Sequence, residues 1–515
     1  MPHHTRRLVA STCLLFLALF IYVSYVFQRY DWDTVETILL PAVRGQAFEP
    51  VPYSFLMYGM ASALGLIADA KLLFALLLFA ACAAYLASGL LVYGIARRAG
   101  CSALAAFAAA GVCLSANAMT YGASHMDDNV FQTFFLVLAV WFLMQPGRPG
   151  HIILSAIAFG VSAAFHIQGI PMAAAALLLI WGWQAKGPAE AVRRILIWGL
   201  VSAGVFLLLL VLHVDPTVLF GIVANALSEG RDAFAIVKEA APPWLATLWG
   251  LVGSLLPLPV NAVPLLQHHS LGPLLLVAGL VPIAIVVLPT VVAAVRARRG
   301  DDRRRFFYLL HLLVGLAACT AFAYFLEPEI QERWIQGAPF FGLLAGELLR
   351  SLETGRWQAL TQKLRPAIGP LIVIMIVVAC IVGRPLAHIA YADSRKAITA
   401  GLLQEIAASV DDETALLLND GFEMVAFYRS AESCYRIVEY YALQIKCWGP
   451  DGRRYLPVDQ TDFLGTRDAF AIYRDFPELA TLGLPEPAEQ EICDPSWTGR
   501  LFGDAACVAL QSGTR

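Results

Sequence analysis

The run LVASTCLLFLALFIYVSYVF, residues 8–27, contains no charged side chain and is long enough to cross a membrane. About 20 apolar residues span the ~30 Å hydrocarbon core of a bilayer as a helix. Similar runs recur up to residue 390, without the period-2 alternation of a membrane β-barrel. Arg6 and Arg7 precede the first run, which lacks a small-residue cleavage site. We therefore interpret it as a retained signal anchor that starts in the cytoplasm.

The composition agrees with a membrane protein. Of the 515 residues, 59% are hydrophobic and only 15% are charged, against about 25% charged in soluble domains. The sequence therefore predicts a mainly α-helical, polytopic transmembrane bundle and excludes a soluble globular protein. The net charge of −3 gives no sign of a nucleic-acid partner, and membrane lipids are the expected surroundings.

The distribution of charge orients the predicted spans. We expect about eleven of them, at residues 8–28, 71–96, 102–121, 129–145, 150–167, 169–184, 194–213, 271–295, 306–326, 335–350 and 367–390. With a cytoplasmic start, the loops rich in lysine and arginine fall on the cytoplasmic side, as the positive-inside rule requires. The same count places the acidic motifs described below on the outer, periplasmic face.

Two domains are expected. Residues 1–392 form the transmembrane domain, with long outer loops at 29–70 and 214–270 that each contain a predicted interfacial or re-entrant helix. Residues 393–515 have the composition of a soluble domain. Short apolar runs between helical patterns there predict a small α/β module, which the span count places outside the cytoplasm.

Cysteine usage agrees with an extracytoplasmic module. The module contains four cysteines, Cys434, Cys447, Cys493 and Cys507. An even number in an oxidising compartment permits two disulfides, and the sequence does not fix their pairing. The other cysteines lie in or beside apolar spans, where a buried small hydrophobe is the usual interpretation.

Two aspartates, Asp31 and Asp33, follow the first span in the segment QRYDWDTVE, residues 28–36. Carboxylates at the mouth of a span are costly to desolvate, which favours a site over a lipid-facing surface. In an extended loop both can converge on a sugar hydroxyl or a divalent metal, and one can act as a general base. The competing interpretation is a solvated loop in which Asp33 or Thr34 caps the next helix. Arg44, further along, can contact an anionic head group or only mark the interface.

A second acidic motif, HMDDN at residues 125–129, opens the fourth predicted span. Asp127 or Asp128 at a helix N-terminus gains ~0.3–1 kcal/mol from the helix dipole, so a structural cap explains one carboxylate. Two carboxylates with His125 exceed what a cap needs, and the surplus favours binding or catalysis. His166, between the fifth and sixth spans, is a further candidate for substrate contact.

The third motif is EPEIQERW, residues 327–334. Arg333 lies on an outer face that is otherwise poor in cations, at the membrane boundary, which suits a lipid-linked phosphate or pyrophosphate. The competing interpretation is a local ion pair with Glu329 or Glu332. Glu332 is also a candidate substrate contact.

The order of these motifs resembles that of the GT-C superfamily of polytopic glycosyltransferases, which includes protein mannosyltransferases and bacterial aminoarabinose transferases. The matching segments are DWDTVE (31–36), AVRG (42–45), PY (52–53), MDDN (126–129) and ERWIQGAPF (332–340). Two positions depart from the family's pattern. Thr34 stands where an acidic residue commonly follows the key aspartate, and Val51 stands where a histidine usually precedes the proline. The choice of base between Asp31 and Asp33 therefore stays open.

The resemblance implies a hexosyl- or pentosyltransferase that uses a polyprenyl-phosphate-linked sugar. The acceptor would be a cell-surface glycan, lipid or protein on the periplasmic face of a bacterial inner membrane. Asp33 or Asp31 would activate the acceptor hydroxyl. Asp127 and Asp128 would orient the sugar or support the base, and Arg333 would neutralise the leaving phosphate. No cofactor is demanded, and a divalent metal at Asp31 and Asp33 stays open.

Two other functions compete with this one. A secondary transporter or flippase would use the acidic residues as substrate or proton sites. However, the ionisable residues cluster at one face, with few near the span centres where transport sites usually lie. A lipid-linked glycan ligase or polymerase would use the same donor chemistry and also stays open.

Overall fold

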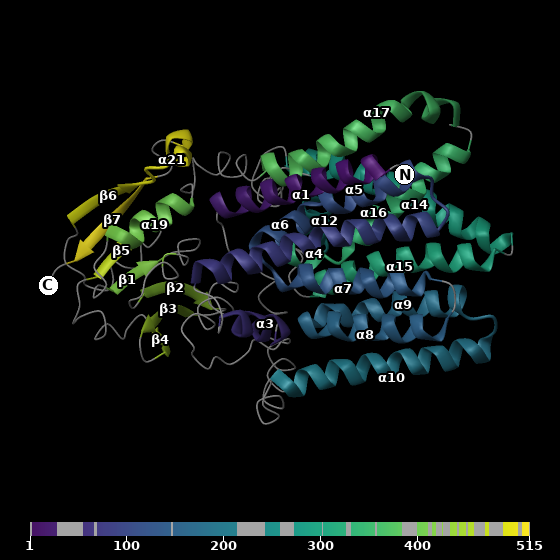
Figure 1. Ribbon diagram of the computed structural model, residues 1–515, viewed down its shortest axis with the longest axis horizontal. Coiled ribbons are helices and arrows are strands. Elements are labelled where there is room, and N and C mark those ends of the chain that lie inside the picture. The colour runs from purple at the N-terminus through teal and green to yellow at the C-terminus, as the bar shows by residue number, and fades with distance from the viewer. Residues whose placement is uncertain are drawn as a thin grey trace. The chain divides into compact units, whose positions relative to one another are not determined.

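The computed structural model divides the chain into two compact units (Figure 1). The first comprises Met1–Leu17, Val51–Met57 and Phe79–Gly383, and the second comprises Ala18–Pro50, Tyr58–Leu78 and Arg384–Arg515. The described residues are 3–27, 55–65, 70–145, 148–213, 243–257, 272–300, 302–325, 331–355, 358–383, 399–409, 415–418, 425, 433–439, 442–449, 452–457, 469–472, 488–502 and 507–513.

Long apolar helices dominate the region before residue 384. The α-helices are α1 (His3–Val26), α3 (Phe55–Gly65), α4 (Ala70–Arg98), α5 (Ala103–Ser115), α6 (Asn117–His125), α7 (Asp128–Leu143), α8 (Pro149–Phe165), α9 (Ala173–Leu179), α10 (Pro188–His213), α12 (Pro243–Leu255), α14 (Gly272–Arg299), α15 (Arg303–Phe325), α16 (Gly337–Thr354) and α17 (Gln358–Val377). Short 3-10 and π segments adjoin them: η2 (Ile167–Met172), η3 (Ile180–Gln184), η4 (Gln331–Trp334) and η5 (Val378–Val382).

These helices confirm the predicted polytopic helical fold. Among the described residues, six helical segments are long and apolar enough to cross a membrane, or seven if α5 and α6 form one bent span. The shorter apolar helices include α7, α8, α12 and the part of α1 from Leu14 onward. Within the described residues, every predicted span overlaps a helix or a run of adjoining helical segments, and the last span, 367–390, extends beyond them at residue 383. The number of membrane crossings stays a prediction.

The predicted span 102–121 is divided by a bend of 56° between α5 and α6. Ala116 at the break has a non-helical backbone, with ψ of 131°. The end of α12 supplies replacement hydrogen bonds, since the backbone N of Asn117 donates to Leu256 O at 3.3 Å and its Nδ2 donates to Gly253 O at 3.0 Å. Because backbone polar groups must be paired inside a membrane, these contacts with α12 stabilise the bend.

Helices α5 and α16 pack closely over small residues. A Cβ atom added to Gly342 would lie 2.5 Å from Ala109 O, and one added to Gly346 would lie 2.9 Å from Ala109 Cβ. Glycines spaced four residues apart allow helix backbones to approach closely in a membrane, where van der Waals packing drives association. The position of α16, and of the η4 segment that precedes it, is therefore fixed relative to α5.

The second unit contains a seven-stranded mixed sheet in the order β4-β3-β2-β1-β5-β7-β6. The strands are β1 (Ala415–Leu418), β2 (Ser433–Glu439), β3 (Ala442–Gly449), β4 (Gly452–Pro457), β5 (Ala469–Ile472), β6 (Ala488–Cys493) and β7 (Cys507–Gly513). Strand β1 is parallel to β2 and β5, and the remaining pairs are antiparallel. Helices α19 (Ala400–Ser409) and α21 (Trp497–Phe502) accompany the sheet. This is the α/β type that the sequence predicts for the module.

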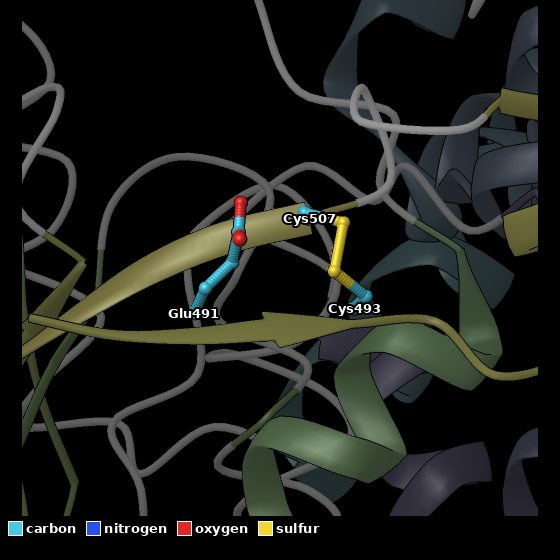
Figure 2. Close-up of side chains that lie close together, drawn as sticks. All are labelled: Glu491, Cys493 and Cys507. Atoms are coloured by element: carbon cyan, nitrogen blue, oxygen red, sulfur yellow. A yellow bond between two sulfur atoms is a disulfide. The ribbon is translucent and has the colours of Figure 1, made fainter.

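Cys493 and Cys507 form a disulfide that joins the neighbouring strands β6 and β7 (Figure 2). With Glu491 they make up the one group, within the described ranges, whose side chains lie close enough together to share a metal ion. A disulfide offers no thiolate to a metal, so these residues do not fit a metal site. Cys434 and Cys447 stand opposite each other in the β2–β3 register. The second disulfide that the sequence permits, with its pairing left open, stays a prediction.

Within the second unit, the end of α1 contacts two segments that are distant along the chain. Trp497 Nε1 in α21 donates a hydrogen bond to Tyr22 Oη at 3.2 Å, and the Trp497 ring meets Phe27 edge-on, with centroids 6.5 Å apart. Tyr25 packs against Phe74 of α4, with ring centroids 5.7 Å apart. These contacts fix the C-terminal end of α1. In the sequence, the first acidic motif follows this end.

Candidate functional site

The structure describes the predicted site residues His125, Asp127, Asp128, His166, Glu332 and Arg333. Asp31, Asp33 and Arg44 lie outside the described residues, so the choice of base between the two aspartates stays a prediction.

The two carboxylates of the second acidic motif are held together at the start of α7. Asp127 caps this helix, because its Oδ1 accepts a hydrogen bond from Asn129 N at 2.7 Å. The side-chain Nδ2 of Asn129 donates to Asp127 Oδ1 at 2.9 Å and to Asp128 Oδ1 at 3.1 Å. Met126 before the cap has a left-handed backbone, with φ of 58°. The capping role weighed for Asp127 is thus present, and Asn129 also fixes the second carboxylate beside it.

His125 lies against Tyr121, one turn earlier in α6. Their rings stack with centroids 3.8 Å apart, and His125 Nδ1 donates to Tyr121 O at 2.9 Å. The hydroxyl of Tyr121 reaches Glu332 Oε1 in η4 at 3.4 Å. The second and third sequence motifs are therefore in contact through Tyr121, which stands 211 positions before Glu332.

The η4 segment packs tightly onto α6. A Cβ atom on Gly122 would lie 2.6 Å from Cδ1 of Ile335, the residue that follows η4, so a larger side chain there requires the end of the Ile335 side chain to move. Arg333 and Glu332 follow one another in η4, with Arg333 Nη1 4.0 Å from Glu332 Oε2. Both side chains remain partly exposed, at 20% and 13%. An ion pair this long in a partly solvated setting is weak.

Four buried carboxamides lie behind these charged residues. The Nε2 of Gln336 lies within hydrogen-bond distance of Asn129 Oδ1 and Gln168 Oε1, at 2.8 Å each, and of Gln132 Oε1. All four side chains are at most 1% exposed. Polar groups buried inside a membrane protein are costly unless paired, so a cluster of this kind favours a functional role.

His166 lies in the link between α8 and η2 and contacts the same cluster. Its Nδ1 accepts a hydrogen bond from Gln168 N at 3.1 Å, and its carbonyl oxygen accepts one from Gln132 Nε2 at 2.7 Å. Burial, and secondarily the charge of Arg333, lower the pKa of His166 well below its usual value of 6.5. The imidazole is therefore neutral at physiological pH, and with Nδ1 as acceptor its proton resides on Nε2.

Sequence reasoning misses Tyr121 and Gln132 as members of this site. Tyr121 stands four residues before His125 in a helix, the spacing at which side chains meet, and this was its available signal. Gln132 stands three residues after Asn129 in an apolar helix, where an amide is unusual. Tyr121 contacts Glu332 and Gln132 contacts Gln336, both in the segment from η4 to α16. A single sequence contains no signal for either contact.

The assembled groups define a polar site where α6, α7, η2 and η4 meet. Two carboxylates at a helix N-terminus are acceptors for hydroxyl groups, and a guanidinium is a fork-shaped donor to phosphate oxygens. A neutral imidazole with its proton on Nε2 adds a donor. This combination suits a ligand that carries both hydroxyls and a phosphate.

The fold is that of a polytopic helical membrane protein. The solved structures that it resembles include ArnT from Cupriavidus metallidurans bound to undecaprenyl phosphate, with a TM-score of 0.53, 14% sequence identity and 98% of each chain covered. The apo state of the same ArnT gives a TM-score of 0.51 at 14% identity, again over 98% of each chain. No protein-family model and no curated protein was found to match. At this identity the likeness establishes the fold alone.

Proposed function

We propose that the chain is an integral-membrane glycosyltransferase, which moves a sugar from a polyprenyl-phosphate donor to an acceptor at the outer face of a bacterial inner membrane. The observation that carries the proposal is the buried hydrogen-bond chain that links the η4–α16 segment, with Arg333, to the carboxylates of Asp127 and Asp128. The fold that holds them resembles ArnT, which has been crystallised with undecaprenyl phosphate.

In the proposed reaction, the acceptor hydroxyl attacks the anomeric carbon of the sugar, and the bond from that carbon to the phosphate oxygen breaks. The polyprenyl phosphate leaves with the electron pair, so negative charge grows on its oxygens. Arg333 stabilises that charge. Asp127 and Asp128 accept hydrogen bonds from the sugar hydroxyls. Asp33 or Asp31 takes the proton of the acceptor hydroxyl.

The proposed topology has a cytoplasmic N-terminus and a periplasmic C-terminal unit. The Cys493–Cys507 disulfide supports this placement, because structural disulfides persist in oxidising compartments. A reporter enzyme that is active only in the periplasm, fused after Asp393, is expected to be active. A silent fusion would place the C-terminal unit in the cytoplasm.

The test of the function is transfer in vitro. The purified chain is reconstituted in liposomes with a labelled polyprenyl-phosphate sugar and a cell-envelope acceptor fraction. We expect covalent transfer by the native chain, and a loss of at least about tenfold in Asp127→Asn and Asp33→Asn. Asp302→Asn is the matched control, because Asp302 is an exposed carboxylate whose Oδ1 accepts a hydrogen bond from Arg305 N at 3.0 Å.

Three results would contradict the proposal in different ways. Unchanged transfer in both site variants would remove the residue assignment. Movement of the labelled lipid-linked sugar across the bilayer without covalent transfer would identify a transporter. Transfer of a preassembled glycan, with no transfer of single sugars, would identify a ligase.

A further inference from the structure

Gln336 is the centre of the buried carboxamide cluster, and its hydrogen-bond roles are fixed by its neighbours. Asn129 uses its Nδ2 to hold Asp127 and Asp128, so its Oδ1 must accept. Gln132 uses its Nε2 to hold His166 O, so its Oε1 must also accept. Gln336 therefore has to turn its NH2 group toward both oxygens, because an amide oxygen there would face two other acceptors.

The two hydrogens of Gln336 are thus fully used by Asn129 and Gln132. The Oε1 of Gln168 lies 2.8 Å from the same nitrogen, and Gln168 Nε2 is buried with no hydrogen-bond partner among the described residues. Gln168 is therefore the one neighbouring carboxamide that receives no hydrogen from Gln336. The two hydrogens of Gln336 bind Asn129 at the start of α7 and Gln132, which in turn binds His166 O in the α8–η2 link.

These links connect the two halves of the candidate site. Gln336 immediately precedes α16 and stands three residues after Arg333. Its contact with Asn129 is one hydrogen bond away from the carboxylates of Asp127 and Asp128. We propose that Gln336 is a positioning residue for sugar transfer. Through Asn129 it holds the two carboxylates at a fixed distance from Arg333, so that the sugar and the leaving phosphate are bound at a fixed separation.

This inference rests on the proposed glycosyltransferase function and adds a role to a residue that touches neither the sugar nor the phosphate. Misplacement of a reacting group by about 1 Å can lower a rate by about a hundredfold. Removal of the Gln336 NH2 group should therefore lower kcat more than it lowers the affinity for the donor.

The test compares Gln336→Met with Gln184→Met in the full-length chain reconstituted with a polyprenyl-phosphate sugar. Gln184 is also a buried glutamine, and its Nε2 donates to Gln145 O at 2.8 Å beyond the C-terminal end of α7, away from the site. Both variants lose hydrogen bonds of one buried amide, so both should lose thermal stability. We expect only Gln336→Met to lower kcat, by about 10- to 100-fold, with the donor KM changed less than about threefold.

A double-variant cycle distinguishes positioning from general damage. If Gln336 acts through Asn129, then Asn129→Leu lowers kcat on its own, and adding Gln336→Met lowers it little further. Multiplicative effects of the two changes would overturn the inference. If Gln336→Met does not accumulate in the membrane, Gln336→Asn is used, which keeps the carboxamide but shortens its reach, and it is expected to show a smaller fall in kcat.

The two levels of proposal fail differently. If the native chain transfers sugar and Gln336→Met keeps the native kcat, the positioning role is wrong and the proposed function stands. If the native chain transfers no sugar to any acceptor, the proposed function is wrong, and the positioning role is wrong with it.

Discussion

Arg305 at the start of α15 and Glu347 in α16 form a buried ion pair, in which Arg305 Nη1 donates to Glu347 Oε1 at 2.9 Å and Nη2 donates to Oε2. Glu347 is only 2% exposed and also lies 3.8 Å from Arg350 Nη1. Arg350 in turn donates to Ala99 O, in the link between α4 and α5, at 2.7 Å. One carboxylate thus connects α15 with α16 and, through Arg350, with the link between α4 and α5.

Glu347→Ala is expected to be strongly destabilising, because it leaves two arginines without their shared carboxylate. Removal of one partner from a buried ion pair typically costs about 3–5 kcal/mol. The measurement is the thermal unfolding midpoint in detergent. Glu353→Ala is the control, since Glu353 accepts a hydrogen bond from Ser102 Oγ at 2.8 Å and its loss should cost less. Equal falls in both variants would argue against a special role for Glu347.

Arg333→Lys should retain charge but lose the planar fork that matches two phosphate oxygens. We expect kcat/KM for the lipid-linked donor to fall by about tenfold, equivalent to about 1.4 kcal/mol, and Arg333→Gln to lower it further. Arg148→Gln removes a charge from the exposed start of α8 and serves as control. If Arg333→Gln keeps the native kcat/KM, the phosphate contact is wrong.

The stability of the bundle should depend on pH through His166. The lowered pKa of this group means that the unfolded chain binds its proton more tightly than the folded chain. Its neutral form therefore favours folding fully above about pH 6.5, and this contribution is lost as the pH falls toward the folded-state pKa. We expect the unfolding midpoint to fall between about pH 7 and pH 5, and to fall less in His166→Gln. Identical pH profiles would show that His166 does not carry the effect.

Gly342→Val tests the close contact of α5 and α16. Its Cβ would overlap Ala109 O at 2.5 Å and Cys113 Cβ at 2.9 Å, so one helix must move. Overpacking typically costs about 1–3 kcal/mol. Gly204→Val in α10 is the matched control, because an added Cβ there meets no atom within 4 Å. We expect lower stability and lower transfer only in Gly342→Val. A native unfolding midpoint in that variant would mean that the helices can separate at little cost.

Much of the helical fold could be predicted from the sequence, because a membrane span needs only an uninterrupted apolar run. The break at Ala116 could not be predicted, because no proline marks it and its stability depends on a contact with α12 across 136 positions of the chain. The helix predicted within the outer segment 214–270 is present as α12, and its contact with Asn117 has no local signal.

The candidate site could also be predicted from the sequence only in part. Asp127, Asp128, His125 and Arg333 stand out in the sequence, because charged or titratable groups are rare beside apolar runs. Gln336 is visible only as a polar residue in a motif. Its role depends on a contact with Asn129 across 207 positions of the chain, and single-sequence patterns carry no information about such a pairing.

The close contact of Gly346 with Ala109 also constrains how this chain can diverge. An added Cβ at position 346 would lie 2.9 Å from Ala109 Cβ, so a larger side chain at one position requires a small one at the other. Side-chain volumes at positions 109 and 346 should therefore be anticorrelated among homologues. This paired restriction would remain when the sequences of the short acidic motifs have changed. It would therefore help to identify distant relatives from the contact between α5 and α16.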